Sequence, residues 1–152
     1  MTGDHAVEQA NAEITRRWFT GGWTTDPDMA DDVFSPQFRT DGLLVGVRGP
    51  LETVRRRLAA FPDLETEIED LISAADKVVV RVRWTGTQTG DYSGVPAGGK
   101  RVEVRVMSIW RFAEGKVVDN WTIQDQFSLL QQTGYLSQDL TTAQGRRYAA
   151  AD

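Results

Sequence analysis

Asp125 and Ser108 are the residues whose types and spacing best suit acid–base chemistry in this chain. Asp125 ends the alternating stretch WTIQD, in phase with Trp121 and Ile123. Ser108 lies on the apolar phase of the preceding alternating stretch, two residues before Trp110. If both phases face one hydrophobic space, a carboxyl group and a hydroxyl meet there. Such a pair could carry out general acid–base catalysis.

The local sequence leaves other interpretations open for each of these residues. Asp125 could instead cap the helical turn QFSLLQQTG by accepting backbone N–H bonds. Ser108 could instead have only a structural role, with its hydroxyl hydrogen-bonded to the backbone. Trp110 and Trp121 are core residues by default, although aromatic walls equally suit a flat aromatic ligand.

The spacing of apolar residues predicts helices first and strands afterwards. Helical periodicity indicates helices over residues 4–19, within TDPDMADDVF and over GPLETVRRRLAAF, whose arginines at 55–57 are expected on a solvated face. Alternation then predicts strands in ETEIEDLIS, KVVVRVRWTGTQ, KRVEVRVMSIWRF and VVDNWTIQD. This order favours one α+β domain over residues 1–152, with helices covering one face of a curved, mostly antiparallel sheet. The tail after about residue 135 is expected to be mobile.

Composition narrows the classes of function. The net charge of −5 argues against nucleic acid as a partner, and the absence of cysteine excludes disulfides and thiolate catalysis. No apolar run reaches the roughly 18 residues of a membrane helix, and no signal peptide is evident, so we expect a cytoplasmic protein without membrane contact. His5 is the only histidine, so no metal site is expected. GVPAGGK has the spacing of a phosphate loop but lacks the Ser or Thr and the helix that should follow.

Two longer stretches resemble a known family. They are GDYSGVPAGGKRVEV and IWRFAEGKVVDNWTIQDQFSLLQQTG, supported by GPLETVRRRLAAFPDLETEIEDLI and VVRVRWTGTQTG. The pattern G-x-[FY]-x-G-x-P, followed by RF-x-x-GK-[IV]-x-x-x-W…D…LL-x-Q-x-G, resembles the SnoaL-like polyketide cyclases of the NTF2-like superfamily, over about residues 14–134. The resemblance implies a cone-shaped α+β barrel, with N-terminal helices packed on a curved sheet around a deep apolar pocket.

The resemblance also implies a reaction. Similar cyclases close the last ring of anthracycline-type polyketides by an intramolecular aldol reaction, without metal or cofactor. An aspartate at the position of Asp125 acts as acid and base. These cyclases also have a histidine three residues before the Arg of the RF motif, where this chain has Ser108. An imidazole can polarise a carbonyl and handle protons, whereas a serine hydroxyl transfers protons poorly near neutral pH.

A second branch of the family fits this difference better. Its members resemble the cyclases but hydroxylate the anthracycline ring system, with no bound cofactor. A separate NADPH-dependent reductase converts the quinone to an electron-rich dihydroquinone, which meets O2 directly. The resemblance therefore implies a hydroxylase of a polycyclic aromatic polyketide, and it also implies a homo-oligomer. In that enzyme Asp125 would move protons, Ser108 would orient a ring oxygen, and Trp110 and Trp121 would pack on the rings.

Two other functions stay open at this point. The first is an aldol cyclase in which Ser108 and water replace the histidine. The second is a non-catalytic NTF2-like protein that binds or carries a hydrophobic ligand. A carrier would keep its activity after Asp125→Asn, whereas an enzyme that uses the carboxylate would lose turnover.

Overall fold

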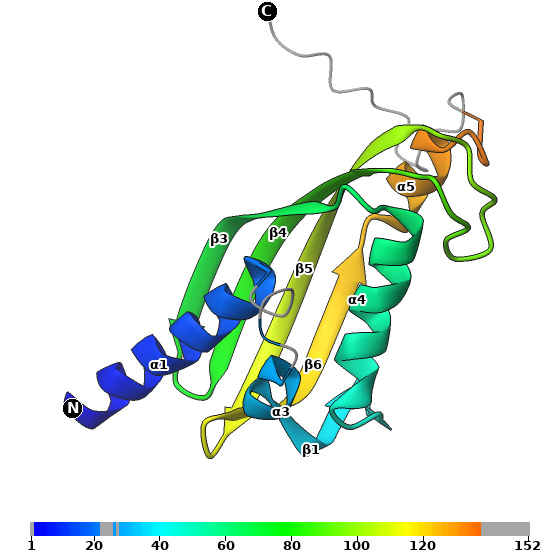
Figure 1. Ribbon diagram of the computed structural model, residues 1–152. Helices are drawn as coiled ribbons and strands as arrows, with labels where there is room; N and C mark the ends of the chain where they lie inside the picture. Colours follow the sequence, from blue (N-terminus) through cyan, green and yellow to red (C-terminus); the bar gives the residue numbers. More distant parts are fainter. Residues whose placement is uncertain (1, 22–25, 27, 138–152) are drawn as a thin grey trace, which may run out of the picture.

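The computed structural model describes residues 2–21, 26 and 28–137, and helices cover one face of its sheet. Figure 1 shows this arrangement for α1 (Thr2–Phe19), α3 (Met29–Val33) and α4 (Arg48–Ala60). A last short helix, α5 (Gln126–Gln132), follows the final strand. The predicted α+β architecture is confirmed. None of the helices in the described part of the chain is long and apolar enough to cross a membrane.

The sheet is open rather than closed into a barrel. In chain order its described strands are β1 (Phe34–Thr40), β2 (Leu43–Leu44), β3 (Glu65–Ala74), β4 (Lys77–Thr87), β5 (Arg101–Ala113) and β6 (Lys116–Gln124). They lie side by side in the order β2-β1-β6-β5-β4-β3, and β2 and β3 form the two edges. Most neighbours are antiparallel, but β1 and β6 are parallel, so the sheet is mixed. The tail expected to be mobile falls within 138–152, outside the described residues.

β4 and β5 contribute many of the buried side chains of the core, as the alternation of apolar residues in their sequences predicts. Alternate side chains of both strands are buried against the helices, while the intervening ones face outward. The register places Val82 opposite Val106 and Val80 opposite Ser108. Burial of each such valine contributes about 1.5–3 kcal/mol. The pairing and packing of these two strands therefore fix the positions of Ser108 and Trp110 on β5.

β1 was not predicted from the sequence. Only two side chains of its seven residues, FSPQFRT, are buried, those of Phe34 and Phe38, and Pro36 lies between them. A proline in the sequence usually argues against a strand, because it has no N–H to donate to the hydrogen bonds between strands. β1 pairs on one side with β6, about 80 residues later in the chain, and on the other side with β2, which has only two residues. Because its long pairing is with a distant strand, the local sequence does not report it.

A bulge interrupts the alternation of β6. Val117 lies opposite Phe112, and Asp119 lies opposite Arg111, which leaves Val118 as an extra residue on β6. Asp119 accepts a hydrogen bond of 3.1 Å from Arg111 Nε. Because side chains alternate between the two faces of a sheet, one extra residue reverses the face of every side chain that follows.

The reversal decides which residues of β6 face the helices. Thr122 and Asn120 point to the concave face, whereas Trp121 and Ile123 are 43% and 79% exposed on the other face. The prediction that Trp121, Ile123 and Asp125 share the inward phase is therefore wrong. In the sequence, nothing after Val117 indicates a break in the alternation. In the structure, the bulge at Val118 interrupts the alternation of inward and outward side chains.

Candidate functional site

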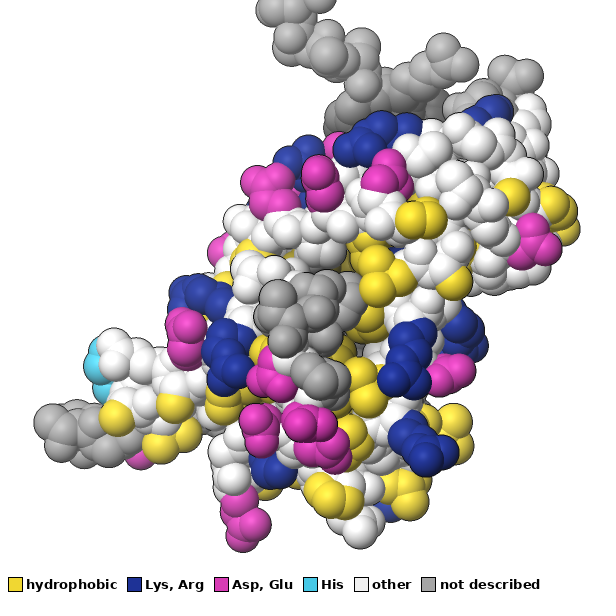
Figure 2. Space-filling model, in the orientation of Figure 1, with side chains coloured by type: hydrophobic (Ala, Val, Ile, Leu, Met, Phe, Trp, Pro, Cys, Tyr) yellow, Lys and Arg dark blue, Asp and Glu magenta, His cyan; other side chains and the backbone are white. Residues whose placement is uncertain are grey.

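A cavity of about 290 Å³ lies between α1, α4 and the concave face of the sheet. This volume is near the lower end of the range for small-molecule sites, about 300–1,000 Å³. Figure 2 shows apolar side chains in the hollow between α1 and α4, with basic side chains beside α4. The aromatic residues that line the cavity are Trp18, Phe19, Phe34, Phe38, Trp84 and Trp110.

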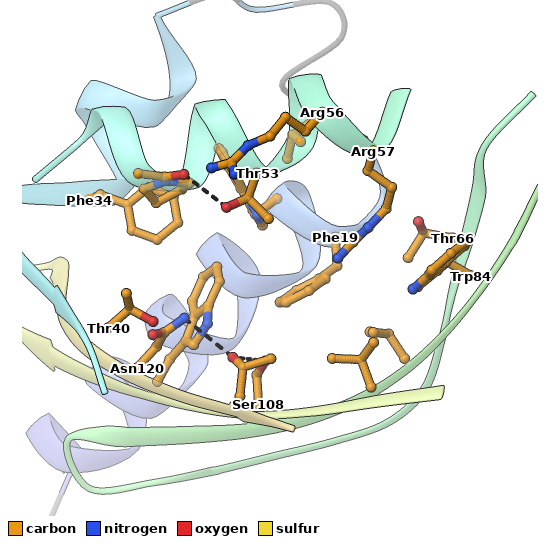
Figure 3. A pocket seen from close by; sticks show the side chains of 18 of the residues that line it. Phe19, Phe34, Thr40, Thr53, Arg56, Arg57, Thr66, Trp84, Ser108 and Asn120 are labelled. Atoms are coloured by element: carbon orange, nitrogen blue, oxygen red, sulfur yellow. Dashed lines mark hydrogen bonds between the residues drawn. The ribbon is translucent and has the colours of Figure 1, made fainter. Parts of the chain in front are cut away.

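Ser108 and Thr122 form one polar end of the cavity. They lie directly opposite each other on β5 and β6, and their hydroxyl oxygens are 2.7 Å apart. Asn120 Nδ2 lies 3.4 Å from Thr122 Oγ1, and its Oδ1 is buried without a hydrogen-bond partner among the described residues. Figure 3 shows Ser108 and Asn120 facing the cavity from the sheet. Together these groups can hold a carbonyl or hydroxyl oxygen of a ligand.

Arg57 and Trp84 form the other polar end. Figure 3 shows Arg57 reaching down from α4 into the cavity, beside the Trp84 indole. Arg57 Cζ lies 5.2 Å from the centroid of the Trp84 ring, a cation–π distance, and Arg57 Nη2 donates to Gln124 Oε1 at 3.3 Å. The expectation that all three arginines of 55–57 lie on a solvated face is wrong for Arg57, which is half-buried.

The end of α4 is anchored so that Arg57 stays over the sheet. Ala60 O accepts hydrogen bonds from Thr89 N at 2.8 Å and from Gly90 N at 3.2 Å. Phe61 packs edge-on against Trp84, with ring centroids 5.0 Å apart. This close approach requires a glycine at 86, because a Cβ there would lie 2.9 Å from the Cβ of Phe61.

Asp125 lies outside the cavity. It is the N-cap of α5, and its Oδ1 accepts a hydrogen bond of 2.9 Å from Ser128 N. Its side chain is exposed, and its backbone N–H donates to Arg105 O on the outward phase of β5. The alternative interpretation of this residue as a helix cap is confirmed. The structure does not bring Asp125 and Ser108 together, and the residue opposite Ser108 is Thr122.

The two predicted tryptophans separate in the same way. Trp110 is buried, lines the cavity and packs on Phe19, with ring centroids 5.1 Å apart. Trp121 lies on the convex face, opposite Ile109. Trp110 is therefore placed to contact a ligand in the cavity, and Trp121 is not.

Arg57 and Thr122 were missed as site residues for different reasons. Arg57 follows Val54 by three positions and precedes Phe61 by four, so helical spacing could have placed it on the apolar face of α4. Its membership of a run of three arginines concealed that signal. Thr122 carried no such signal, because its inward phase depends on the bulge at Val118.

Within the described residues, no group of three or more His, Asp or Glu side chains is arranged to hold a metal ion. His5 lies on α1 with an exposed side chain, and its Nδ1 is 3.9 Å from a Glu8 carboxylate oxygen. The polar groups of the side chains that line the described part of the cavity are hydroxyls, a carboxamide, indole N–H groups and two guanidinium groups. Such groups bind oxygen atoms and negative charge.

The sequence matches a family model described as SnoaL-like polyketide cyclase over residues 13–133. No functionally curated protein matches the chain.

Several solved structures have the same fold. TsrD from Streptomyces laurentii is 29% identical with a TM-score of 0.74, and the match covers 88% of this chain and 98% of TsrD. A candidate SnoaL-like polyketide cyclase from Jannaschia sp. CCS1 is 26% identical with a TM-score of 0.75, covering 86% of this chain and 95% of that one. AclR, a candidate hydroxylase from Streptomyces galilaeus, is 26% identical with a TM-score of 0.69, covering 88% of this chain and 98% of AclR.

Proposed function

We propose that this chain, which belongs to the SnoaL-like polyketide cyclase family, is a tailoring enzyme that hydroxylates a polycyclic aromatic polyketide with O2. The ring system is of the anthracycline type, and its reducing electrons come from a separate NADPH-dependent reductase. The protein itself uses no bound cofactor in this reaction. The likeness to AclR over most of both chains supports hydroxylation as the chemistry.

The observation that carries the proposal is the pair of hydroxyls at the polar end of the cavity. Ser108 and Thr122 are hydrogen-bonded to each other at 2.7 Å beside the Trp110 ring. Hydroxyls orient a ring oxygen well, but they take up protons poorly near neutral pH. Aldol closure needs a group that removes a proton from carbon. A dihydroquinone gives electrons to O2 without a protein group first removing a proton from carbon. Hydroxylation therefore needs a protein base less than aldol closure does.

In the proposed reaction the reductase first adds two electrons and two protons to the quinone. The dihydroquinone then transfers electrons to O2, and one oxygen atom forms a bond to a ring carbon. The O–O bond breaks, the second oxygen leaves as water, and the ring returns to the quinone form with a new hydroxyl. The role of the cavity is to hold the rings against Trp110 and to fix one ring oxygen on Ser108 and Thr122.

Isotope labelling tests this proposal. The protein is incubated with an anthracyclinone quinone, a quinone reductase, NADPH and ¹⁸O2, and the product is analysed by mass spectrometry. The expected result is one labelled oxygen in the product, at a rate that depends on this protein. Ser108→Ala should lower that rate about 2- to 10-fold, the effect of losing one ordinary hydrogen bond. Label from water instead of O2 contradicts the proposal.

An aldol cyclase is the second candidate, and family membership favours it. In this case Ser108 and Thr122 would polarise the carbonyl, and an ordered water would carry the proton. Incubation of a tricyclic ester precursor without O2 distinguishes the two functions. Ring closure that depends on this protein would support the cyclase, and its absence would remove it.

A non-catalytic carrier of hydrophobic ligands is the third candidate. The aromatic lining of the cavity suits binding as well as catalysis. A carrier predicts tight ligand binding with no turnover in either of the two assays above. Turnover in one of them would exclude it.

We also propose that the chain forms a homo-oligomer through the convex face of β5 and β6. Ile109 lies opposite Trp121 and Met107 opposite Ile123, and their exposed fractions run from 36% to 79%. Beside this apolar patch, Arg105 forms ion pairs with acidic side chains of β3 and β5, so the face carries both signs of charge. A second copy related by a two-fold axis would cover the apolar patch and set opposite charges against each other.

A further inference from the structure

Two buried donors at one end of the cavity have no hydrogen-bond partner within the described residues. They are Arg57 Nε and Trp84 Nε1. Trp84 is only 1% exposed, so water does not reach its indole nitrogen freely. A buried N–H without an acceptor costs free energy, and native proteins retain such groups mainly where a ligand or ordered water meets them.

The two donors are held in one place by different elements. Arg57 comes from α4, and its Nη2 is fixed by Gln124 Oε1 at 3.3 Å. Trp84 comes from β4, and its ring is fixed by Phe61 and by the guanidinium 5.2 Å away. Figure 3 shows the Arg57 guanidinium and the Trp84 nitrogen turned toward the same space, next to Thr66. Thr66 lies directly opposite Trp84 on β3 and also lines the cavity.

The charged groups that line the cavity are positive, and the one beside Trp84 is Arg57. Arg56 and Arg57 are the charged residues of the described lining. The outward-facing Arg83 differs, because its guanidinium forms ion pairs with Glu67 and Glu103. Arg57 forms no ion pair with a carboxylate of the described residues at N···O distances up to 4.0 Å. Its charge is therefore available to a ligand.

The other residues that line the cavity determine what shape of ligand fits it. Along the sheet, Val82 and Val106 lie opposite each other between Trp84 at one end and Ser108 at the other. Trp84 and the residue opposite Ser108 are four positions apart on β4, which corresponds to about 13 Å. The arrangement suits a flat apolar body of several fused rings with an oxygen at each end.

We propose that the Arg57 guanidinium and the Trp84 indole N–H form an oxyanion subsite, which binds an ionised phenol or enolate oxygen at the edge of a fused aromatic ring system. The ligand then binds as its anion and releases its proton to water, so no protein carboxylate is needed at this end. This inference rests on the proposed function only in taking the ligand to be a hydroxylated polycyclic aromatic. In that reaction the bound anion is more electron-rich than the neutral phenol, which favours electron transfer to O2.

A coloured phenol tests the subsite without turnover. The probe is 2-hydroxyanthraquinone, whose absorption moves to longer wavelength on ionisation, and 2-methoxyanthraquinone is its partner that cannot ionise. The pKa of the bound hydroxyl, read from the absorption spectrum, should fall by about one unit or more relative to the free probe, as expected beside an unpaired cation. Arg57→Met should abolish the shift and weaken binding of the ionised probe about 10- to 100-fold. Binding of 2-methoxyanthraquinone should change little.

Matched variants separate the subsite from general effects of charge and packing. Arg55→Met removes the same charge from the exposed side of the same helix and should leave the shift intact. Trp84→Phe removes the indole N–H while keeping an aromatic ring, and should reduce the shift. If Arg57→Met does not fold, Arg57→Lys keeps the charge but loses the planar donor set, and should retain only part of the shift.

Three results obtained with bound probe would overturn the subsite. They are a bound pKa equal to or above that of the free probe, a shift that survives Arg57→Met, or equal losses of affinity for both probes in that variant. Absence of any binding of 2-hydroxyanthraquinone to the wild-type chain would overturn it as well. Failure of oxygen labelling with the pKa shift intact would count against hydroxylation alone.

Discussion

Substitution of Asp125 separates a structural role from a chemical one. Its visible interaction is the hydrogen bond from Ser128 N at 2.9 Å, which caps α5. Loss of a cap costs about 0.5–2 kcal/mol, and the exposed position of this side chain favours a value near 1 kcal/mol. Asp125→Ala should therefore lower Tm by about 2–4 °C in a chain of this size. Asp125→Asn should cost only a few tenths of a kcal/mol, because asparagine caps as well as aspartate does.

The assay is thermal unfolding followed by circular dichroism, with probe binding and turnover measured on the same preparations. Asp28→Ala is a matched control, because Asp28 is the N-cap of α3 but forms no side-chain capping bond, and its loss should change Tm less. Both Asp125 variants should bind ligand as the wild type does. A drop in turnover of tenfold or more in Asp125→Asn, with stability and affinity unchanged, would refute the cap as a full account of this residue.

Three further predictions concern other parts of the molecule. Ser108→Ala and Thr122→Val should be non-additive in ligand affinity, because the two hydroxyls bind each other at 2.7 Å; additive effects in a double-mutant cycle would contradict this. Trp121→Lys should shift sedimentation toward the monomer and leave the spectrum of the bound probe unchanged, and an unchanged sedimentation coefficient would refute the convex interface. The backbone N–H and then the hydroxyl of Thr87 lower the pKa of Asp63 below 3.8, so its contribution to stability is present above that pH and is lost as the pH falls through the lowered value. Asp63→Asn should therefore flatten the decline of urea-measured stability below about pH 4, and an unchanged slope would count against this contribution.

The strands were predictable where a single period governs a long stretch. β4 and β5 bury every second residue along nearly their whole length, so alternation in the sequence located Ser108 and Trp110 correctly. The helices α1 and α4 were predictable for the same reason, since their apolar spacing is regular. In each case one local rule determines which face of the element is buried.

The rest of the site depended on events that no local rule reports. The bulge at Val118 results from how β6 pairs with β5, and it turned Trp121 away from the cavity while turning Thr122 toward it. Arg57 was assigned to solvent because charged side chains usually lie there, but the cavity beneath α4 gives its guanidinium room among aromatic rings. Register and tertiary packing, rather than residue type, decided these positions.

Hydroxylation within the cavity is tested by the incorporation of ¹⁸O from ¹⁸O2 into a chemically reduced anthracyclinone, measured with an open and with a filled cavity. Thr53 is exposed on α4 and faces the cavity, so Thr53→Trp should fill the space without disturbing the buried core. We predict labelled product with the wild-type chain and at least about a tenfold loss of label with this variant, because the cavity is where the rings bind. Label that enters equally with both proteins, or oxygen that comes from water, would contradict it.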